Sequence, residues 1–180
     1  MKIFLIILAV LVSIIVILLI AALFIKKDYA LEKEITINKP KQAIFDYVVL
    51  MKNHKNFNKW MMVDPNMKVD YTGTDGTPGF KLSWDSENKQ AGKGVQEIVS
   101  VNAGDRINYK ITFIKPFDGK ADAYISTTEN GDDQTKVKWG FSSAMKYPMN
   151  AMMLFVDIPK MLGKDLDTSL VNLKKIMEAQ

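Results

Sequence analysis

The 180-residue sequence contains no cysteine and a single histidine, His54. Without cysteine the chain has no thiol nucleophile, no disulfide and no zinc site of the Cys/His type. The acidic residues Asp64, Asp157 and Asp165 lack the spacing of a carboxylate metal site. We therefore expect the protein to hold neither a metal ion nor a cofactor.

An excess of one charge sign is missing from most of the chain. The sequence has 24 basic and 20 acidic residues and a formal net charge of +4. Three of the basic residues, Lys2, Lys26 and Lys27, precede every acidic residue, which leaves 21 basic and 20 acidic side chains in residues 28–180, a net charge of +1. A domain so close to neutral lacks the basic surface of a nucleic-acid-binding protein. We expect no nucleic-acid partner.

The N-terminal segment is a long hydrophobic run. From Ile3 to Ile25 there are 23 consecutive uncharged residues, of which only Ser13 is polar. At about 1.5 Å per residue, a helix of this length crosses the roughly 30 Å hydrocarbon core of a bilayer. The sequence predicts a transmembrane anchor over residues 1–27, inserted through residues 3–25, and hence a single-pass membrane protein.

A cleaved signal peptide is the alternative interpretation of this run. A signal peptide has an apolar core of only about 7–15 residues, followed by a cleavage site of small residues. Ala21-Ala22 is a poor version of such a site. The positive charges are also balanced, with the α-amine and Lys2 before the run and Lys26 and Lys27 after it, so the positive-inside rule leaves the side of the globular domain open.

The globular part begins with mixed patterns. Weak alternation predicts a strand over residues 31–37, and Pro40 then marks a helix start. Apolar residues fall on one helical face over residues 41–52, and a second helical piece covers residues 55–61.

From residue 68 onward the apolar period changes to two. Turns rich in Gly, Pro, Asn and Asp separate the alternating segments, which favours an antiparallel meander. The predicted strands span residues 69–72, 80–84, 95–101, 107–114, 121–128 and 136–142. From about residue 150 to the end the period is helical again, and Pro159 and Gly163 are predicted to kink the start of this helix.

Glycines crowd the segment from Gly73 to Gly94. A phosphate-binding loop needs glycines that lead directly into a helix N-terminus. Here Gly79 leads into the alternating residues 80–84, and Gly94 leads into the alternating residues 95–101. Glycine before a strand marks a turn or a bulge, so this segment is predicted to be a hairpin edge.

The order of these elements and several short motifs resemble the helix-grip fold of the START-like superfamily, also called SRPBCC. The likeness is greatest to its polyketide cyclase/dehydrase-type branch and covers about residues 29–178. The motifs are Ile35–Pro40, Phe57–Trp60, Pro78–Trp84, Gly92–Gly94, Tyr109–Phe113, Thr135–Trp139 and Gly163–Lys174.

The resemblance implies an α+β domain over residues 28–180, in which an antiparallel sheet of about seven strands wraps around a long C-terminal helix. A cavity between sheet and helix would take a hydrophobic small molecule or a lipid. Such proteins range from ligand carriers to cyclases and chaperone-ATPase activators, so a cyclase or dehydratase enzyme and a protein-interaction module stay as alternatives. We expect a monomer.

Aromatic and methionine side chains are the candidates to line this cavity. Apolar pockets are lined by aromatic residues, although the same residues also fill ordinary cores. Methionine clusters at the expected cavity mouth and suits adaptable surfaces, with core filling as the alternative. Gln96 is the polar candidate to orient a ligand. The predicted ligand-binding residues are Trp60, Trp84, Gln96, Tyr109, Phe113, Trp139, Phe141, Met145 and Met152.

A catalytic residue is not predicted. His54 lies among Asn53, Lys55 and Asn56 and is expected to be solvated. The sequence has no G-x-S-x-G motif that would pair a nucleophile with it. An enzyme would need a buried acid or base, and Gln96, Tyr109 and Tyr124 are the only polar side chains expected to point inward.

Overall fold

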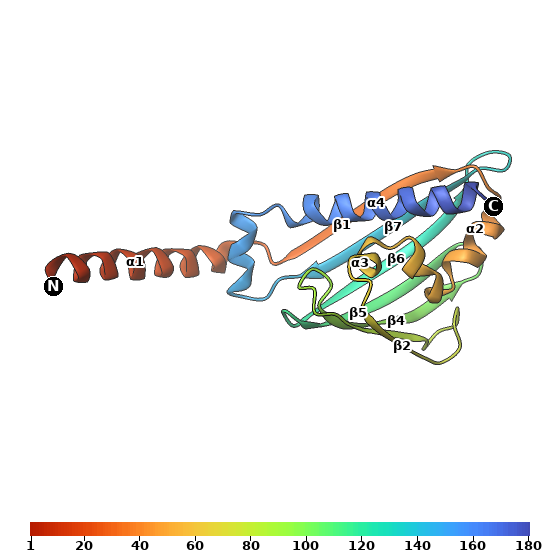
Figure 1. Ribbon diagram of the computed structural model, residues 1–180. Helices are drawn as coiled ribbons and strands as arrows, with labels where there is room; N and C mark the ends of the chain where they lie inside the picture. The colour runs from red at the N-terminus through yellow and green to blue at the C-terminus, as the bar shows by residue number, and fades with distance from the viewer.

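A seven-stranded antiparallel sheet and two long helices make up most of the chain in the computed structural model, which describes residues 1–180 (Figure 1). The helices are α1 (Lys2–Phe24), α2 (Lys41–Val48), α3 (Lys59–Met62) and α4 (Ile158–Glu178), with 3-10 helices η1 (Met51–Asn56) and η2 (Met149–Leu154). The strands are β1 (Asp28–Ile37), β2 (Lys68–Thr72), β3 (Lys81–Asp85), β4 (Lys93–Asn102), β5 (Arg106–Lys115), β6 (Gly119–Glu129) and β7 (Thr135–Ala144).

The sheet has the strand order β1-β7-β6-β5-β4-β3-β2, and every neighbouring pair is antiparallel. Strands β2 to β7 form the meander that the short turns predicted. Strand β1 joins its far edge, where Asp28 pairs with Ala144 and Ile37 with Thr135. The α+β fold and the strand count expected from the sequence are thereby confirmed.

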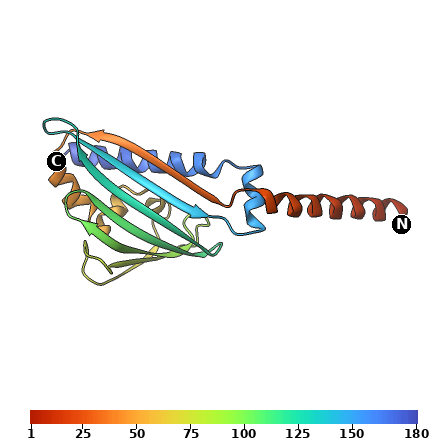
Figure 2. The ribbon, with the colours of Figure 1, turned by 180° about the vertical axis from the view of Figure 1, so that it is seen from behind.

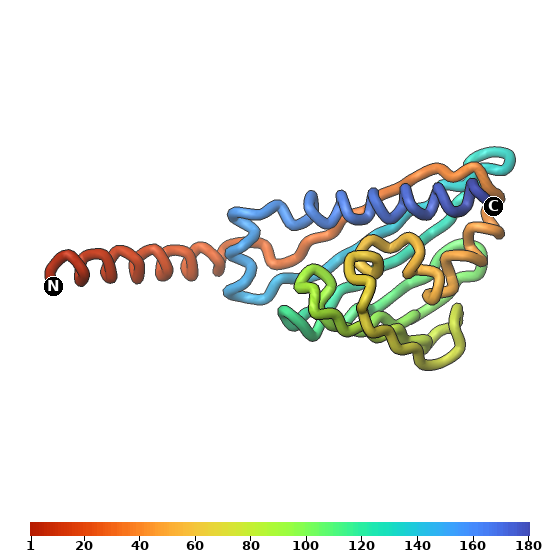
Figure 3. The backbone as a smooth tube through the Cα atoms, in the orientation of Figure 1, coloured from red at the N-terminus to blue at the C-terminus, as the bar shows by residue number.

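Helix α4 covers one face of the sheet, as the tube view shows (Figure 3). Leu166, Leu170, Leu173 and Met177 recur at helical spacing and are almost completely buried. These four side chains form the apolar stripe predicted for the C-terminal helix, and burying such a stripe against a sheet is what holds a long surface helix in place.

The start of this helix differs from the prediction. The helix expected from about residue 150 is divided into η2 and α4, and residues 155–157 separate them. Asp157 accepts a hydrogen bond from the backbone nitrogen of Lys160 at 3.0 Å and thereby caps α4. Pro159 lies in the first turn, where its missing N–H costs no helical hydrogen bond.

Helix α2, η1 and α3 lie on the same side of the sheet as α4 (Figures 1 and 3). Ile44, Phe45 and Val48 of α2, Met51 of η1 and Phe57 after it join the hydrophobic core. The core therefore lies between the sheet on one side and α4 with the short helices on the other.

Helix α1 extends away from the globular domain (Figure 2). It is a helix of 23 residues, long and apolar enough to cross a membrane. The globular domain contacts the C-terminal end of α1 through Asn150 of η2. The side-chain nitrogen of Asn150 donates to the backbone carbonyls of Ala22 at 2.6 Å and of Ile25 at 3.3 Å. These carbonyls are among those that a helix end leaves without partners.

Candidate ligand-binding pocket

An apolar pocket of about 190 Å³ lies between the inner face of the sheet, α3 and the first turns of α4. We call it the inner pocket. Ten of its thirteen lining residues are hydrophobic, and the polar ones are amides. The lining consists of Asn58, Trp60, Met61, Trp84, Gln90, Ala91, Gln96, Ile111, Phe113, Ala123, Trp139, Phe141 and Leu162.

Six of the nine predicted ligand-binding residues meet in this lining. They are Trp60, Trp84, Gln96, Phe113, Trp139 and Phe141. Strand alternation explains the convergence of the five residues on strands, because inward residues of β3, β4, β5 and β7 face the same space, whereas Trp60 comes from α3. All three tryptophans of the chain are among them.

The other lining residues are outside the predicted set of nine. Ile111 alternates with Tyr109 and Phe113 on the inward row of β5, and Ala123 lies inward on β6, so strand alternation indicates both positions. Gln90 and Ala91 come from the loop between β3 and β4, where no periodic pattern signals an inward position. Leu162 lies on α4, one turn before the buried stripe.

The position of Trp84 in the wall of the inner pocket depends on Gly94 of the neighbouring strand β4. Gly94 pairs with Trp84 across β3 and β4, and a Cβ on Gly94 would lie 2.5 Å from the indole ring. The indole nitrogen donates to the carbonyl of Ala91 at 2.9 Å, which ties the loop to the strand. Phe113 meets the ring edge to face, with centroids 6.2 Å apart. The glycine-rich hairpin edge predicted from the sequence thus serves to seat an aromatic side chain.

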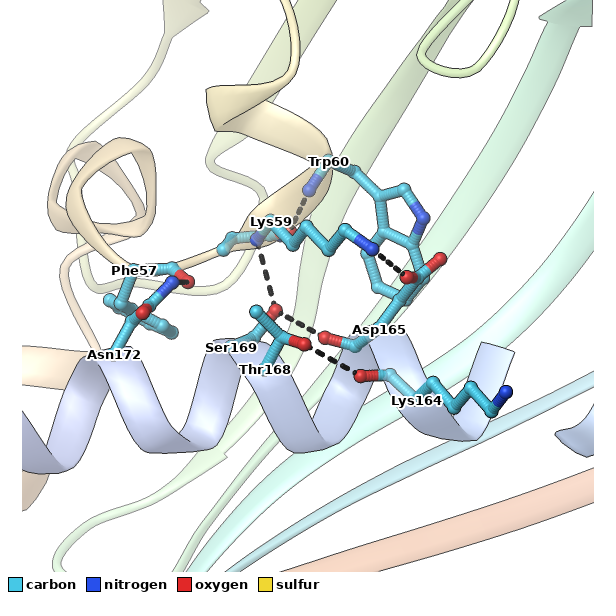
Figure 4. A network of polar contacts seen from close by, with 9 residues as sticks. Phe57, Lys59, Trp60, Lys164, Asp165, Thr168, Ser169 and Asn172 are labelled. Atoms are coloured by element: carbon cyan, nitrogen blue, oxygen red, sulfur yellow. Dashed lines mark hydrogen bonds and ion pairs between the residues drawn. The ribbon is translucent and has the colours of Figure 1, made fainter. Parts of the chain in front are cut away.

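Helix α3 carries Trp60 and Met61 to the pocket and is fastened to α4 by polar contacts (Figure 4). The backbone nitrogen of Lys59 donates to the Ser169 hydroxyl at 2.9 Å, and this hydroxyl donates to the carbonyl of Asp165 at 2.8 Å. The Lys59 ammonium also pairs with the Asp165 carboxylate. We call these contacts the α3–α4 network, and they hold one wall of the pocket in place.

Two further hydrogen bonds hold the N-terminal end of α3. Asn172 of α4 donates to the carbonyl of Phe57 at 3.3 Å, just before α3 begins (Figure 4). Asn58 caps α3, because its side-chain oxygen accepts from the backbone nitrogen of Trp60 at 3.0 Å. A helix of only four residues is not stable alone, so these caps and contacts are what position Trp60.

A second hollow of about 270 Å³ adjoins the inner pocket at the end of the sheet next to α1. We call it the proximal hollow. It shares Gln90, Ala91 and Phe113 with the inner pocket. Met145 and Met152, the two predicted methionines, line the proximal hollow and not the inner pocket. The predicted set is therefore divided between two neighbouring spaces.

Tyr109 lies in the core, where only 1% of its surface is exposed, and it is absent from both linings. Its hydroxyl has no hydrogen-bond partner within the chain. Burial raises the pKa of this phenol, so it stays protonated throughout the ordinary pH range. Tyr109 packs behind the pocket wall and does not reach into it.

The expectation of a solvated His54 is wrong. His54 is 1% exposed, and its ring packs against Phe57, Tyr109 and Trp139 with centroids 5.1, 5.8 and 6.3 Å away. The Val48 carbonyl lies 3.0 Å from Nε2, and because a carbonyl only accepts, Nε2 carries the hydrogen. Desolvation by burial lowers the pKa of His54 to about 4, so the imidazole is neutral at pH 7.

A broader, open groove of about 680 Å³ lies on the opposite face of the sheet. Tyr124 is part of it, so its expected inward orientation is also wrong. The ring lies over Gly140, the Arg106 guanidinium stacks on it at 3.5 Å, and its hydroxyl donates to Glu32. Charged side chains of both signs flank this groove, and it lacks the enclosed apolar character of the inner pocket.

Comparison with known proteins identifies the fold of the chain. No protein-family model matches the sequence, and no curated protein matches it. Norcoclaurine synthase from Thalictrum flavum, in complex with dopamine and hydroxybenzaldehyde, is similar in structure with a TM-score of 0.63 at 12% identity, over 86% of this chain and 90% of that one.

Two further structures share the architecture. Major latex-like protein 151 from Panax ginseng aligns with a TM-score of 0.63 at 14% identity, over 84% of this chain and 98% of its own. The Aha1 dimer from Colwellia psychrerythraea aligns with a TM-score of 0.56 at 13% identity, over 83% of this chain and 96% of its own. Together with the sheet order and the buried stripe of α4, these likenesses show that residues of the globular domain adopt the helix-grip fold of the START-like, or SRPBCC, proteins.

Proposed function

We propose that the protein binds a hydrophobic small molecule or a lipid in the inner pocket and is tethered to a membrane by residues 1–27. The observation that carries the proposal is the lining of the pocket, which contains three tryptophans, two phenylalanines and three amides. Apolar pockets with a few polar groups are the usual form of small-molecule sites. Norcoclaurine synthase, which shares this fold, is found in complex with dopamine and hydroxybenzaldehyde, and a small aromatic molecule would also suit this lining.

The size of the pocket limits the ligand. Ligand pockets commonly measure about 300–1,000 Å³. The inner pocket alone holds about 190 Å³, enough for a small ring system, and the proximal hollow adds about 270 Å³ beyond their shared wall at Phe113. A longer ligand such as an acyl chain would therefore occupy both spaces and displace the Phe113 side chain from between them.

Asn150 supports the retention of α1 as an anchor. Asn150 is completely buried, and its side-chain donors pair only with carbonyls of Ala22 and Ile25. Cleavage after the hydrophobic run would remove both carbonyl partners together with the cover that α1 gives to η2. This contact between the domain and the end of α1 supports a retained tether over a cleaved signal peptide.

The enzyme alternative receives less support from the pocket. The polar lining groups are the amides of Asn58, Gln90 and Gln96, and none of them transfers protons at neutral pH. His54 and Tyr109 lie behind the wall, and burial keeps both uncharged. A cyclase or dehydratase would have to act on its substrate by orientation alone.

A matched pair of alanines tests the proposed site. Ala123 lines the inner pocket, whereas Ala121, two residues earlier on the same face of β6, does not. Ala123→Leu fills the pocket and should abolish binding of an apolar fluorescent probe to the full chain in detergent. Ala121→Leu overfills the core at a similar cost, roughly 1–3 kcal/mol, but should leave the probe affinity unchanged.

Tryptophan emission gives the readout, because all three tryptophans line the pocket. Bound probe should quench or shift that emission at close to one probe per chain. Native mass spectrometry of the protein extracted in detergent should also detect a co-purified apolar molecule. A folded chain that takes up no probe would remove the carrier interpretation and favour the protein-interaction module.

A further inference from the structure

Large apolar side chains are exposed at one end of the globular domain. Leu154, the last residue of η2, is 51% exposed, and Phe155, which follows it, is 74% exposed. Phe117, in the turn between β5 and β6, is 61% exposed. With Met152 and Val156, also exposed, these side chains form what we call the apolar collar.

The apolar collar lies where α1 meets the domain. Asn150 of η2 holds the carbonyl of Ala22 near the end of α1, and the backbone nitrogen of Met145 donates to the carbonyl of Lys27 at 2.9 Å. In both ribbon views η2 runs across the axis of α1 (Figures 1 and 2). If α1 crosses a bilayer, η2 lies along the membrane surface, with Leu154 and Phe155 at the level of the headgroups.

Charge around the apolar collar favours a lipid surface. Segments 26–28, 115–120 and 144–160 contain twice as many lysines as aspartates and no other charged residue. The lysines are Lys26, Lys27, Lys115, Lys120, Lys146 and Lys160, and the aspartates are Asp28, Asp118 and Asp157. Apolar side chains bordered by lysines are the pattern of segments that bind the interface of an anionic bilayer.

The collar also borders the way into the pocket. Met152 and Phe117 line the proximal hollow, which shares Phe113 with the inner pocket. Residues that contact the membrane would thus be the same residues that form the mouth of the hollow. A ligand dissolved in the bilayer would pass from lipid to pocket without crossing water.

We propose that the apolar collar inserts into the headgroup region of the bilayer that α1 crosses, and that the proximal hollow opens onto that bilayer as the entrance for a lipid-soluble ligand. This inference rests on the proposed function, because it takes α1 as a retained anchor. It goes further by assigning η2, its C-terminal flank and the β5–β6 turn to the membrane surface. Anionic lipid headgroups would pair with the excess of lysines around the apolar collar, whereas a protein partner with an uncharged surface would not.

The absence of cysteine makes the test direct, because one introduced cysteine is the only labelling site. The full chain is reconstituted in vesicles that contain anionic lipid, and a polarity-sensitive fluorophore is attached to one of four single-cysteine variants. Phe155→Cys and Phe117→Cys report on the apolar collar. Ile14→Cys reports on the middle of α1, and Asp132→Cys reports on the β6–β7 turn at the opposite end of the sheet. Lipids that carry a quencher high on the acyl chain, for the collar, or near its end, for Ile14, are compared with aqueous iodide.

We expect the lipid quencher to remove most of the fluorescence at Phe155 and Phe117, several-fold more than at Asp132, while iodide quenches Asp132 alone. If Ile14 is quenched by lipid but Phe155 and Phe117 respond only to iodide, α1 is an anchor and the membrane-surface inference is wrong. If the collar labels are shielded from both quenchers, a protein covers the collar and the inference is again wrong. If Ile14 is not quenched by lipid, the anchor fails and the inference fails with it.

Discussion

The side-chain amide of Asn150 donates to the backbone carbonyl of Ala22 at 2.6 Å, across 128 positions of sequence. This contact satisfies a carbonyl that α1 leaves open at its C-terminal end, and it joins the long hydrophobic helix to the globular domain. We expect Asn150→Asp, which keeps the size but removes the donor, to destabilise the full chain in detergent by roughly 1–3 kcal/mol. Thermal unfolding and protease cleavage around residues 149–157 measure the loss.

The control for Asn150 is the fragment 28–180, in which Ala22 is missing. There the same substitution should cost clearly less, because the donor has no partner to lose. An equal cost in both forms would show that Asn150 acts within the domain and does not hold α1.

The fragment 28–180 should itself fold as a monomer. None of the residues in the hydrophobic core cluster comes from α1, and the domain is charge-rich with a net charge of only +1. Size-exclusion chromatography with light scattering and circular dichroism will check this. A folded fragment that always aggregates would indicate that more apolar surface is exposed than the collar.

The full chain should remain in the membrane fraction after carbonate and high-salt washing. The 23 uncharged residues from Ile3 to Ile25 transfer enough apolar surface into lipid to outweigh any salt-sensitive contact. A soluble mature form that begins near Lys26, detected by mass spectrometry of the native protein, would contradict this prediction and show that the segment is cleaved.

His54 should make stability depend on pH. The pKa of His54 is about 4 in the folded chain and about 6.5 in the unfolded chain. Between these two pH values the unfolded chain therefore binds a proton at His54 and the folded chain does not. The contribution of His54 to the free energy of unfolding is fully present above pH 6.5 and is lost as the pH falls toward 4. The total loss is on the order of 3 kcal/mol.

His54→Gln keeps a donor for the Val48 carbonyl and removes the titration. The stability difference between wild type and this variant, from chemical unfolding at several pH values, should therefore shrink between pH 6.5 and pH 4. Parallel curves would mean that His54 is accessible to water in the folded chain.

Gly94→Ala should displace Trp84. The added Cβ would meet the indole at 2.5 Å and the backbone carbonyl of Thr112 at 2.7 Å, and the carbonyl cannot move without breaking the sheet. We expect a loss of roughly 1–3 kcal/mol, together with a shift in tryptophan emission and weaker probe binding. Gly119→Ala, whose Cβ would lie 3.6 Å from the nearest neighbouring atom, is the matched control and should change little.

The sheet and much of the pocket lining could be predicted because strand alternation carries both. Trp84, Phe113, Trp139 and Phe141 project inward at every second position, so the pattern that indicated strands also indicated the wall. The loop residue Gln90 has no such period, and its place depends on the closure of the β3–β4 loop over Trp84.

His54 shows why local polarity was misleading. Its neighbours Asn53 and Lys55 are polar, but η1 is a tight helix that turns successive side chains to different sides. His54 therefore faces the core while Lys55 faces solvent, and only the packing of α2 and Trp139 against the ring decides this. The two methionines are also hard to place. The sequence puts Met145 and Met152 before α4 but does not indicate whether they line the inner pocket or the proximal hollow, which is where they lie.

The pairing of β1 with β7 sets an order for biosynthesis. Strand β1 leaves the ribosome directly after α1, yet its partner is complete only when Ala144 has been made. Until then the backbone N–H and C=O groups on the β1 edge that β7 will cover are unpaired and open to pairing with another strand. A nascent chain arrested before β7 would therefore present an unpaired strand edge that favours aggregation, and the sheet can close onto β1 only once its last strand has been made.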